Sequence, residues 1–192
     1  MIQKFTFFLI AAFLLSGSMN AQTKYTVKSY TLLVNGTSNV HDWSSKATSI
    51  NVTGDFAINN GGIEKINSAS VNVVAKSLKS TKNSDIMDER TYSTIKADKF
   101  QYITYIMTKV VSIQKNGAET IVTVSGNLTI AGVSKPTDLV LKCKVLASGD
   151  LQITGSKKIQ MSNHGIKPPS FMLGAMKVGD ELTISYDVVL KK

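Results

Sequence analysis

The 192-residue sequence is basic, with a formal net charge of +9, and 43% of its residues are hydrophobic. Its length fits one domain, and Cys143, the single cysteine, excludes an intramolecular disulfide. Every basic residue except Arg90 is a lysine, and the lysines are scattered in runs no longer than two, so we expect no nucleic-acid partner. Weak attraction to an anionic membrane surface stays open.

Residues 1–21 have the pattern of a secretory signal peptide. Lys4 precedes an apolar run from Phe5 to Leu15, and small or polar residues follow as far as Ala21. The run is shorter than the roughly 20 residues that a membrane-spanning helix needs. We therefore expect cleavage near Ala21, a mature domain of residues 22–192, and a periplasmic or secreted location.

Apolar and polar residues alternate with a period of two over most of the mature chain, which is typical of strands with one buried face. Near the C-terminus, for example, Leu182, Ile184 and Tyr186 alternate with Thr183 and Ser185. About eight strands are predicted in this way, over residues 30–36, 43–58, 68–76, 102–111, 119–130, 139–146, 149–161 and 182–190.

Short turns separate several of these strands. Residues 59–62 (Asn-Asn-Gly-Gly), Asn116-Gly117 and residues 148–150 (Ser-Gly-Asp) tolerate the backbone angles of tight turns. Such turns join antiparallel neighbours. Closure into a barrel would protect every sheet edge, while a two-sheet sandwich stays open as the alternative.

One segment breaks the alternation, from Ser84 to Phe100. Asp85 and Asp88 lie at its start and Lys96 near its end, an order that complements a helix dipole. We predict one helix, or two short ones, inserted between strands.

The residues with reactive side chains do not form a recognisable catalytic set. His41 and Asp42 are predicted to lie on a strand, where neighbours point to opposite faces and cannot form a dyad. His41 and Trp43 then share one face, and this pair would help to hold the chain in place where it enters the barrel. With His164 as the only other histidine, and Cys143 on an apolar face as a buried inert thiol, we expect no catalysis, no metal and no cofactor.

Several motifs, taken in chain order, resemble one family. They are residues 35–43 (Asn-Gly-Thr-Ser-Asn-Val-His-Asp-Trp), Met87-Asp88 before the helix, Ile103-x-Tyr105 after it, residues 126–136 (Gly-Asn-Leu-Thr-Ile-Ala-Gly-Val-Ser-Lys-Pro), and residues 164–169 with 178–181 before the last strand. These resemble the pattern of the YceI-like, polyisoprenoid-binding family from about residue 25 to the C-terminus.

The resemblance implies an all-β, eight-stranded antiparallel lipocalin-like barrel with a short helical insertion, whose cavity accepts a polyisoprenoid or a related long-chain lipid. Two features depart from the family pattern. Residues 163–166 read Asn-His-Gly-Ile where familiar members have Asp-Phe-Gly-Ile, and Arg90 is the only arginine near the helix. A changed loop at the cavity mouth would alter the ligand.

Alternation also assigns candidate ligand-binding residues to the inner face of the barrel. An eight-stranded barrel is just wide enough to be filled by its own side chains or to hold one small ligand, so a self-filled core stays open. The predicted cavity lining is Val73, Ile103, Tyr105, Met107, Leu141, Ile184 and Tyr186.

A second set of residues is predicted at the cavity mouth or its cap. Residues 166–176 form an unusually apolar loop, which either caps the cavity or meets a lipid surface, or else packs back on the barrel. The polar head of a ligand would lie at this mouth, where lysines could pair with a phosphate. The predicted mouth residues are His41, Trp43, His164, Phe171 and Met172.

The sequence thus predicts an exported lipid carrier without turnover. The alternative is a structural or interaction barrel with a filled core, whose loop binds a protein partner. Association of two copies stays open.

Overall fold

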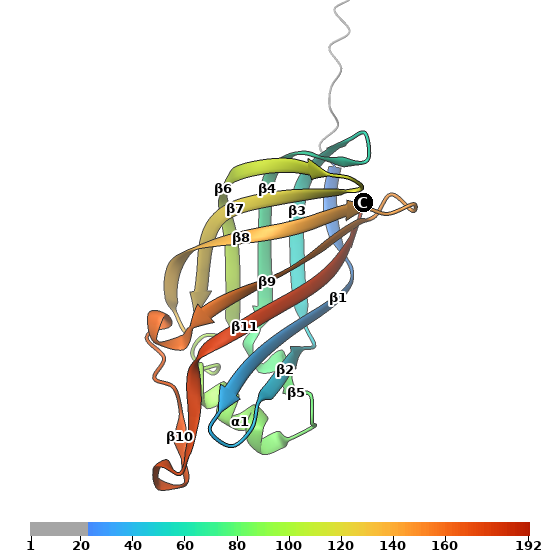
Figure 1. Ribbon diagram of the computed structural model, residues 1–192. Coiled ribbons are helices and arrows are strands. Elements are labelled where there is room, and N and C mark those ends of the chain that lie inside the picture. Colours follow the sequence, from blue (N-terminus) through green and yellow to red (C-terminus); the bar gives the residue numbers. More distant parts are fainter. Residues whose placement is uncertain (1–22) are drawn as a thin grey trace, which may run out of the picture.

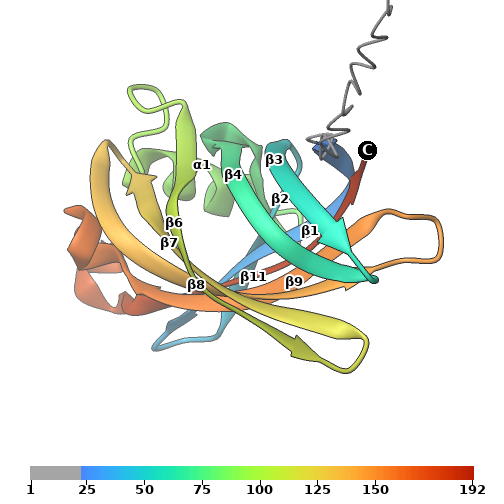
Figure 2. The same ribbon diagram turned by 90° about the horizontal axis from the view of Figure 1, so that it is seen from above.

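The structure, a computed structural model, describes residues 23–192, so the predicted signal peptide and its cleavage site lie outside the described residues. Within that range, eight long or medium strands wrap around a common interior (Figures 1 and 2). They are β1 (Thr23–Ser38), β3 (Ile50–Asn59), β4 (Gly62–Val74), β6 (Tyr102–Asn116), β7 (Glu119–Ile130), β8 (Val133–Val145), β9 (Leu151–Gln160) and β11 (Met176–Lys191).

All pairings in this sheet are antiparallel, and the first strand pairs with the last. The hydrogen-bonded order runs β1-β3-β4-β6-β7-β8-β9-β11, and β11 then pairs with β1 from Thr26 opposite Lys191 to Ser38 opposite Val178. The predicted barrel is therefore correct, and the sandwich alternative is wrong. Closure removes the sheet edges that an open sandwich would expose.

Three short strands extend the barrel at its lower end in Figure 1. β2 (Trp43–Ala47) pairs with the second half of β1, and β5 (Leu78–Ser80) pairs with β2. β10 (Ser170–Phe171) forms a small hairpin with the start of β11. Three single-turn helices accompany them, η1 (Ala75–Ser77), η2 (Met161–His164) and η3 (Met172–Gly174).

The prediction of one continuous strand over residues 43–58 is wrong. The chain breaks at Thr48 and Ser49 because these residues hydrogen-bond to the crossing segment at η1. The amide and hydroxyl of Thr48 both donate to the Ser77 carbonyl, at 2.9 and 3.0 Å, and Ser77 Oγ donates to the Ser49 carbonyl. β2 therefore leaves the line of β3 and lies against the other half of β1.

The inserted helix is α1 (Asp85–Thr94), which is shorter than the predicted segment. Ser84 caps it by accepting a hydrogen bond from the Met87 amide, and Asp85 and Asp88 lie in its first turn, as a helix dipole favours. It ends because Lys96 adopts a positive φ of 54°. Lys96 therefore lies beyond the helix and not in its last turn.

The core is packed most tightly at the end opposite α1, next to the hairpin turns. Tyr25 and Phe56 make an edge-to-face contact with ring centroids 5.5 Å apart. The largest fully buried side chains around them include Ile63, Leu151 and Leu190, from strand ends near those turns. One end of the barrel is thus closed by its own side chains. Among the described residues, no helix is long and apolar enough to cross a membrane.

Candidate functional site: an apolar cavity open toward the helix

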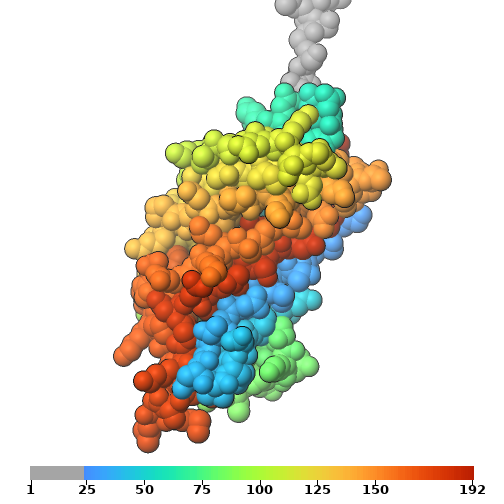
Figure 3. Space-filling model, viewed as in Figure 1, coloured from blue at the N-terminus to red at the C-terminus, as the bar shows by residue number. Residues whose placement is uncertain are grey.

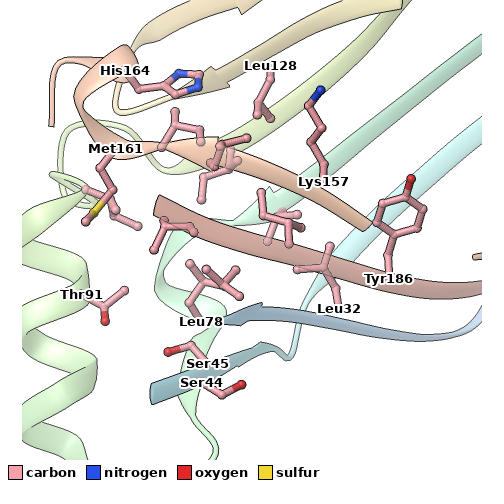
Figure 4. Close-up of a pocket in the computed structure, with 18 of the residues that line it drawn as sticks. Leu32, Ser44, Ser45, Leu78, Thr91, Leu128, Lys157, Met161, His164 and Tyr186 are labelled. Atoms are coloured by element: carbon pink, nitrogen blue, oxygen red, sulfur yellow. The ribbon is translucent and has the colours of Figure 1, made fainter. Parts of the chain in front are cut away.

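A cavity of about 490 Å³ lies in the barrel between this packed end and α1. Its volume falls within the roughly 300 to 1,000 Å³ of typical small-molecule sites. Aliphatic and aromatic side chains from the inner face of the strands form most of its wall (Figure 4). The floor consists of Phe56, Ile66, Val124, Ile153 and Val188, which separate the cavity from the packed end.

Every residue predicted to line the cavity lies on its wall. Five come from β6 and β11, where alternate residues face inward, and the other two come from β4 and β8. These residues are Val73, Ile103, Tyr105, Met107, Leu141, Ile184 and Tyr186. Ile103, Met107 and Ile184 keep part of their surface exposed although they point inward, because they border empty space. Their contact with a ligand stays a prediction.

Two tyrosines on the cavity wall donate hydrogen bonds to the backbone of β8. The Tyr105 hydroxyl donates to the Thr137 carbonyl at 3.1 Å, and the Tyr186 hydroxyl donates to the Val140 carbonyl at 3.4 Å. Burial raises the pKa of Tyr105 to about 12 and raises the pKa of Tyr186 as well. Both phenols stay protonated near neutral pH, so they act as hydrogen-bond donors and not as bases.

Glycines make room for these two rings. A Cβ at Gly126 would lie 2.5 Å from the Tyr105 ring, and one at Gly155 would lie 2.5 Å from the Tyr186 hydroxyl. Any side chain at these positions would force the tyrosine or the neighbouring backbone to shift.

The mouth of the cavity is formed by α1, the loop after β1, and β10. Three of the predicted mouth residues border it, namely His41, Trp43 and Phe171. Arg90 of α1 lies over the Phe171 ring, with its guanidinium carbon 4.0 Å from the ring centroid. This cation–π contact joins the helix to the β10 hairpin across the opening.

Of the other two predicted mouth residues, Met172 lies away from the cavity and His164 lies on its buried wall. Met172 does not line the cavity: its side chain is 72% exposed at the hairpin tip, since η3 turns it away from the barrel. His164 borders the cavity from η2 but is buried, and its Nδ1 donates to the Val133 carbonyl at 3.1 Å. His164 is therefore a structural link between η2 and β8.

His41 and Asp42 lie in the loop between β1 and β2, and the prediction that they occupy a strand is wrong. The chain turns here because Ser38 Oγ accepts hydrogen bonds from the amides of Val40 and His41 and donates to the His41 carbonyl. Both side chains are exposed. Over residues 23–192, no three His, Cys, Asp or Glu side chains come close enough to hold a metal ion.

β8 and β9 separate along part of their length, which leaves a seam in the wall. Their ladder joins only residues 142–145 to residues 151–154. Past that point, over the described residues, β8 is held instead by side-chain hydrogen bonds from other elements, from Tyr186 of β11 to Val140 and from His164 of η2 to Val133. The face that contains this seam is turned to the viewer in Figures 1 and 3.

Most of this chain matches a known protein family. The model of the YceI-like domain matches residues 25–190 of this chain. The chain belongs to the YceI-like family. No curated protein matches it in sequence.

Several solved structures share the fold of this YceI-like chain at low sequence identity. BcnA from Burkholderia cenocepacia is 12% identical, with a TM-score of 0.68 over 83% of this chain and 95% of its own. A polyisoprenoid-binding domain from Saccharophagus degradans is 12% identical, with a TM-score of 0.64 over 87% and 97%. The Campylobacter jejuni YCEI protein is 18% identical, with a TM-score of 0.59 over 77% and 84%. At these identities the likeness shows a shared fold.

Sequence reasoning missed several polar residues on the wall of this YceI-like cavity, three of which bear on its chemistry. Ser45 of β2, Arg90 of α1 and Lys157 of β9 all line it. The alternation of Ile153, Lys157 and Ile159 was a sufficient signal for Lys157. Ser45 and Arg90 could not be found in this way because the break at Thr48 and the placement of α1 depend on long-range contacts.

Proposed function

We propose that this protein is an exported carrier that holds one polyisoprenoid or similar long-chain amphiphilic lipid in its barrel, without turnover. The observation that supports the proposal is the 490 Å³ cavity with its mainly apolar wall. Each CH₂ group that such a wall removes from water contributes about 0.8 kcal/mol. A long hydrocarbon chain therefore needs few polar contacts to be retained.

Two further features favour a carrier over the alternative of a self-filled interaction module. Side chains close only one end of the barrel, so the other end keeps space for a guest. A family relationship and the fold shared with a polyisoprenoid-binding domain point the same way. The signal peptide predicted for residues 1–21 supports export to the periplasm or beyond.

The test is native mass spectrometry of protein purified from its own host, together with a variant that fills the cavity. We expect an extra mass that corresponds to a lipid on the wild-type protein. Ile184→Trp adds a large ring beside the empty space and should lower lipid occupancy at least tenfold. Ser185→Trp places the same ring on the outer face of β11 and should leave occupancy unchanged.

Two results would contradict the carrier. One is a wild-type protein that never carries or accepts a lipid, and the other is equal lipid occupancy in the folded Ile184→Trp and Ser185→Trp proteins. Circular dichroism of both variants establishes that the comparison is between folded barrels.

A further inference from the structure

A lysine lies on the inner face of the barrel, among apolar side chains. Burial along β9 alternates so that Ile153, Lys157 and Ile159 face inward, and all three line the cavity. Lys157 is part-buried. Its side chain is extended away from β11 in Figure 4. An ammonium group in such a wall is costly unless a partner or water compensates it.

No carboxylate of the described chain compensates this charge. The four ion pairs over residues 23–192 involve Lys28, Lys76, Lys79 and Lys158, and none involves Lys157. Among the cavity-lining residues only Asp42 has a carboxyl group, and it is exposed in the loop at the mouth. Lys82 and Arg90 add two more cations to the lining. The charges that border the cavity are thus predominantly positive.

Strand register places a second unpartnered polar group in line with Lys157 across three strand pairs. Lys157 is opposite Ile184, Ile184 is opposite Val34, and Val34 is opposite Ser45. All four residues line the cavity. Three strand spacings separate Lys157 from Ser45, or about 14 Å along the curved wall. In Figure 4 they lie on opposite sides of the view.

Ser45 is 1% exposed, and its hydroxyl has no hydrogen-bond partner among the described residues. A buried hydroxyl without a partner is unfavourable and rare in folded proteins. On the cavity wall, therefore, a cation and a hydroxyl donor both lack partners, while the wall between them is apolar.

Building on the carrier proposal, we propose that the guest is an amphiphile with an oxyanion head group, a carboxylate or a phosphate, and that this group pairs with Lys157 inside the barrel and not at its mouth. Ser45, three strand spacings away, offers a separate hydrogen-bond donor and not a second contact to the same head group. The hydrocarbon chain then lies along the apolar surface on the floor side. Lys157 is therefore a specificity-determining residue, because it makes the protein bind anionic lipids more tightly than neutral ones.

The experiment compares probes with the same chain and different heads. Dissociation constants of hexadecanoate, hexadecyl phosphate and hexadecanol are measured by calorimetry on the delipidated protein at neutral pH. We expect one or both anionic probes to bind about tenfold more tightly than hexadecanol, which is the gain in affinity expected from one charge-assisted hydrogen bond. Which anion is preferred distinguishes a fatty-acid-like guest from a phosphate-bearing one.

Lys157→Met keeps the length of the side chain and removes its charge. It should remove the preference for anions and leave the affinity for hexadecanol unchanged, whereas Lys157→Arg should keep the preference. Lys158→Met is the matched control, because Lys158 is the next residue, points outward and pairs with Glu181 at 2.8 Å. It should behave like the wild-type protein. If Lys157→Met does not fold, Lys157→Gln replaces it.

The outcomes separate this inference from the carrier proposal. Equal binding of charged and neutral probes by the wild-type protein, or an undiminished preference for anions in Lys157→Met, overturns the role of Lys157 and leaves the carrier intact. Binding of no probe at all overturns both.

Discussion

Cys143 shows how the barrel interior suppresses the reactivity of a single side chain. It lies on the inner face of β8 and is 2% exposed. Burial, with a smaller contribution from Glu119, raises the pKa of its thiol to about 12. The thiolate, which is the reactive species, is therefore about one part in ten thousand of the thiol at pH 8.

We expect native protein to react negligibly with a thiol-specific disulfide reagent at pH 8 and to react fully once unfolded in guanidinium chloride. Because the thiolate population grows about tenfold for each pH unit below the pKa, residual labelling should rise with pH in the same proportion while the barrel stays folded. Ser156→Cys, on the exposed outer face of β9, is the control that should label within minutes. Stoichiometric labelling of native Cys143 at pH 8 would contradict this account.

At the residue scale, the sequence predicted which strand side chains face inward, because alternation alone determines that orientation. Ile103, Tyr105 and Met107 face inward because successive strand residues point to opposite sides. The hydrogen bond from Tyr105 to Thr137 joins residues distant in the chain, so the sequence contained no signal for it. The loop position of His41 likewise depends on the three hydrogen bonds made by Ser38.

At the element scale, the β10 hairpin is unusual because its tip combines a strained backbone with exposed apolar side chains. Met172 and Leu173 both have a positive φ, 53° and 52°, which costs a bulky residue about 1 kcal/mol or more. Their side chains are 72% and 110% exposed. The tip projects from the lower end of the molecule in Figure 3. No burial within the described chain offsets this strain, while Phe171 beside it faces the cavity mouth.

The contact between Arg90 and Phe171 should slow the release of a guest. Replacing Arg90 by Leu removes the cation–π interaction, which at a partly exposed site contributes about 0.5 to 1 kcal/mol. We expect dissociation of a bound fluorescent lipid, followed by stopped flow, to become about two- to fivefold faster, with little change in melting temperature.

Lys99→Ala is the control for this prediction. It removes a cation–π contact to Phe100, at 5.4 Å, that is not part of the cavity lining. Its dissociation rate should match that of the wild-type protein. Equal rates in all three proteins would show that the hairpin does not hold the mouth closed.

Helices and strands were predictable where one local pattern dominates. Ser84 followed by Asp85 and Asp88 marks the start of α1 in the sequence itself. Its end does not appear there, because the positive φ of Lys96 depends on how the following turn packs. The predicted strand over residues 43–58 concealed a break for the same reason, since Thr48 bonds to Ser77.

At the scale of the whole molecule, the decisive property is the space left inside the closed sheet. Sequence alternation predicts which side chains face inward, but the volume they enclose depends on strand tilt and stagger. The structure combines the two alternatives that the sequence left open. Side chains such as Tyr25, Leu151 and Leu190 fill one end, while the other end holds the cavity.

A guest in this cavity should stabilise the whole barrel, since it binds the folded state alone. At a free hexadecanoate concentration one hundred times its dissociation constant, the unfolding free energy should rise by about 2.7 kcal/mol. For a domain of this size the melting temperature should then increase by about 5 to 10 °C, as measured by scanning calorimetry. The Ile184→Trp protein should show no increase; an equal increase would place the ligand outside the cavity.

The seam between β8 and β9 has a mechanical consequence. Spreading a complete ladder breaks a row of backbone hydrogen bonds, whereas the ladder between β8 and β9 ends at Thr154 and β8 is held beyond it by single side-chain bonds from Tyr186 of β11 and His164 of η2. The girth of the barrel is therefore less fixed along this line than along the complete ladders, such as that between β7 and β8. For the proposed carrier we therefore expect guests of unequal thickness to be accommodated at little cost, with discrimination among them falling on their length and on their polar end.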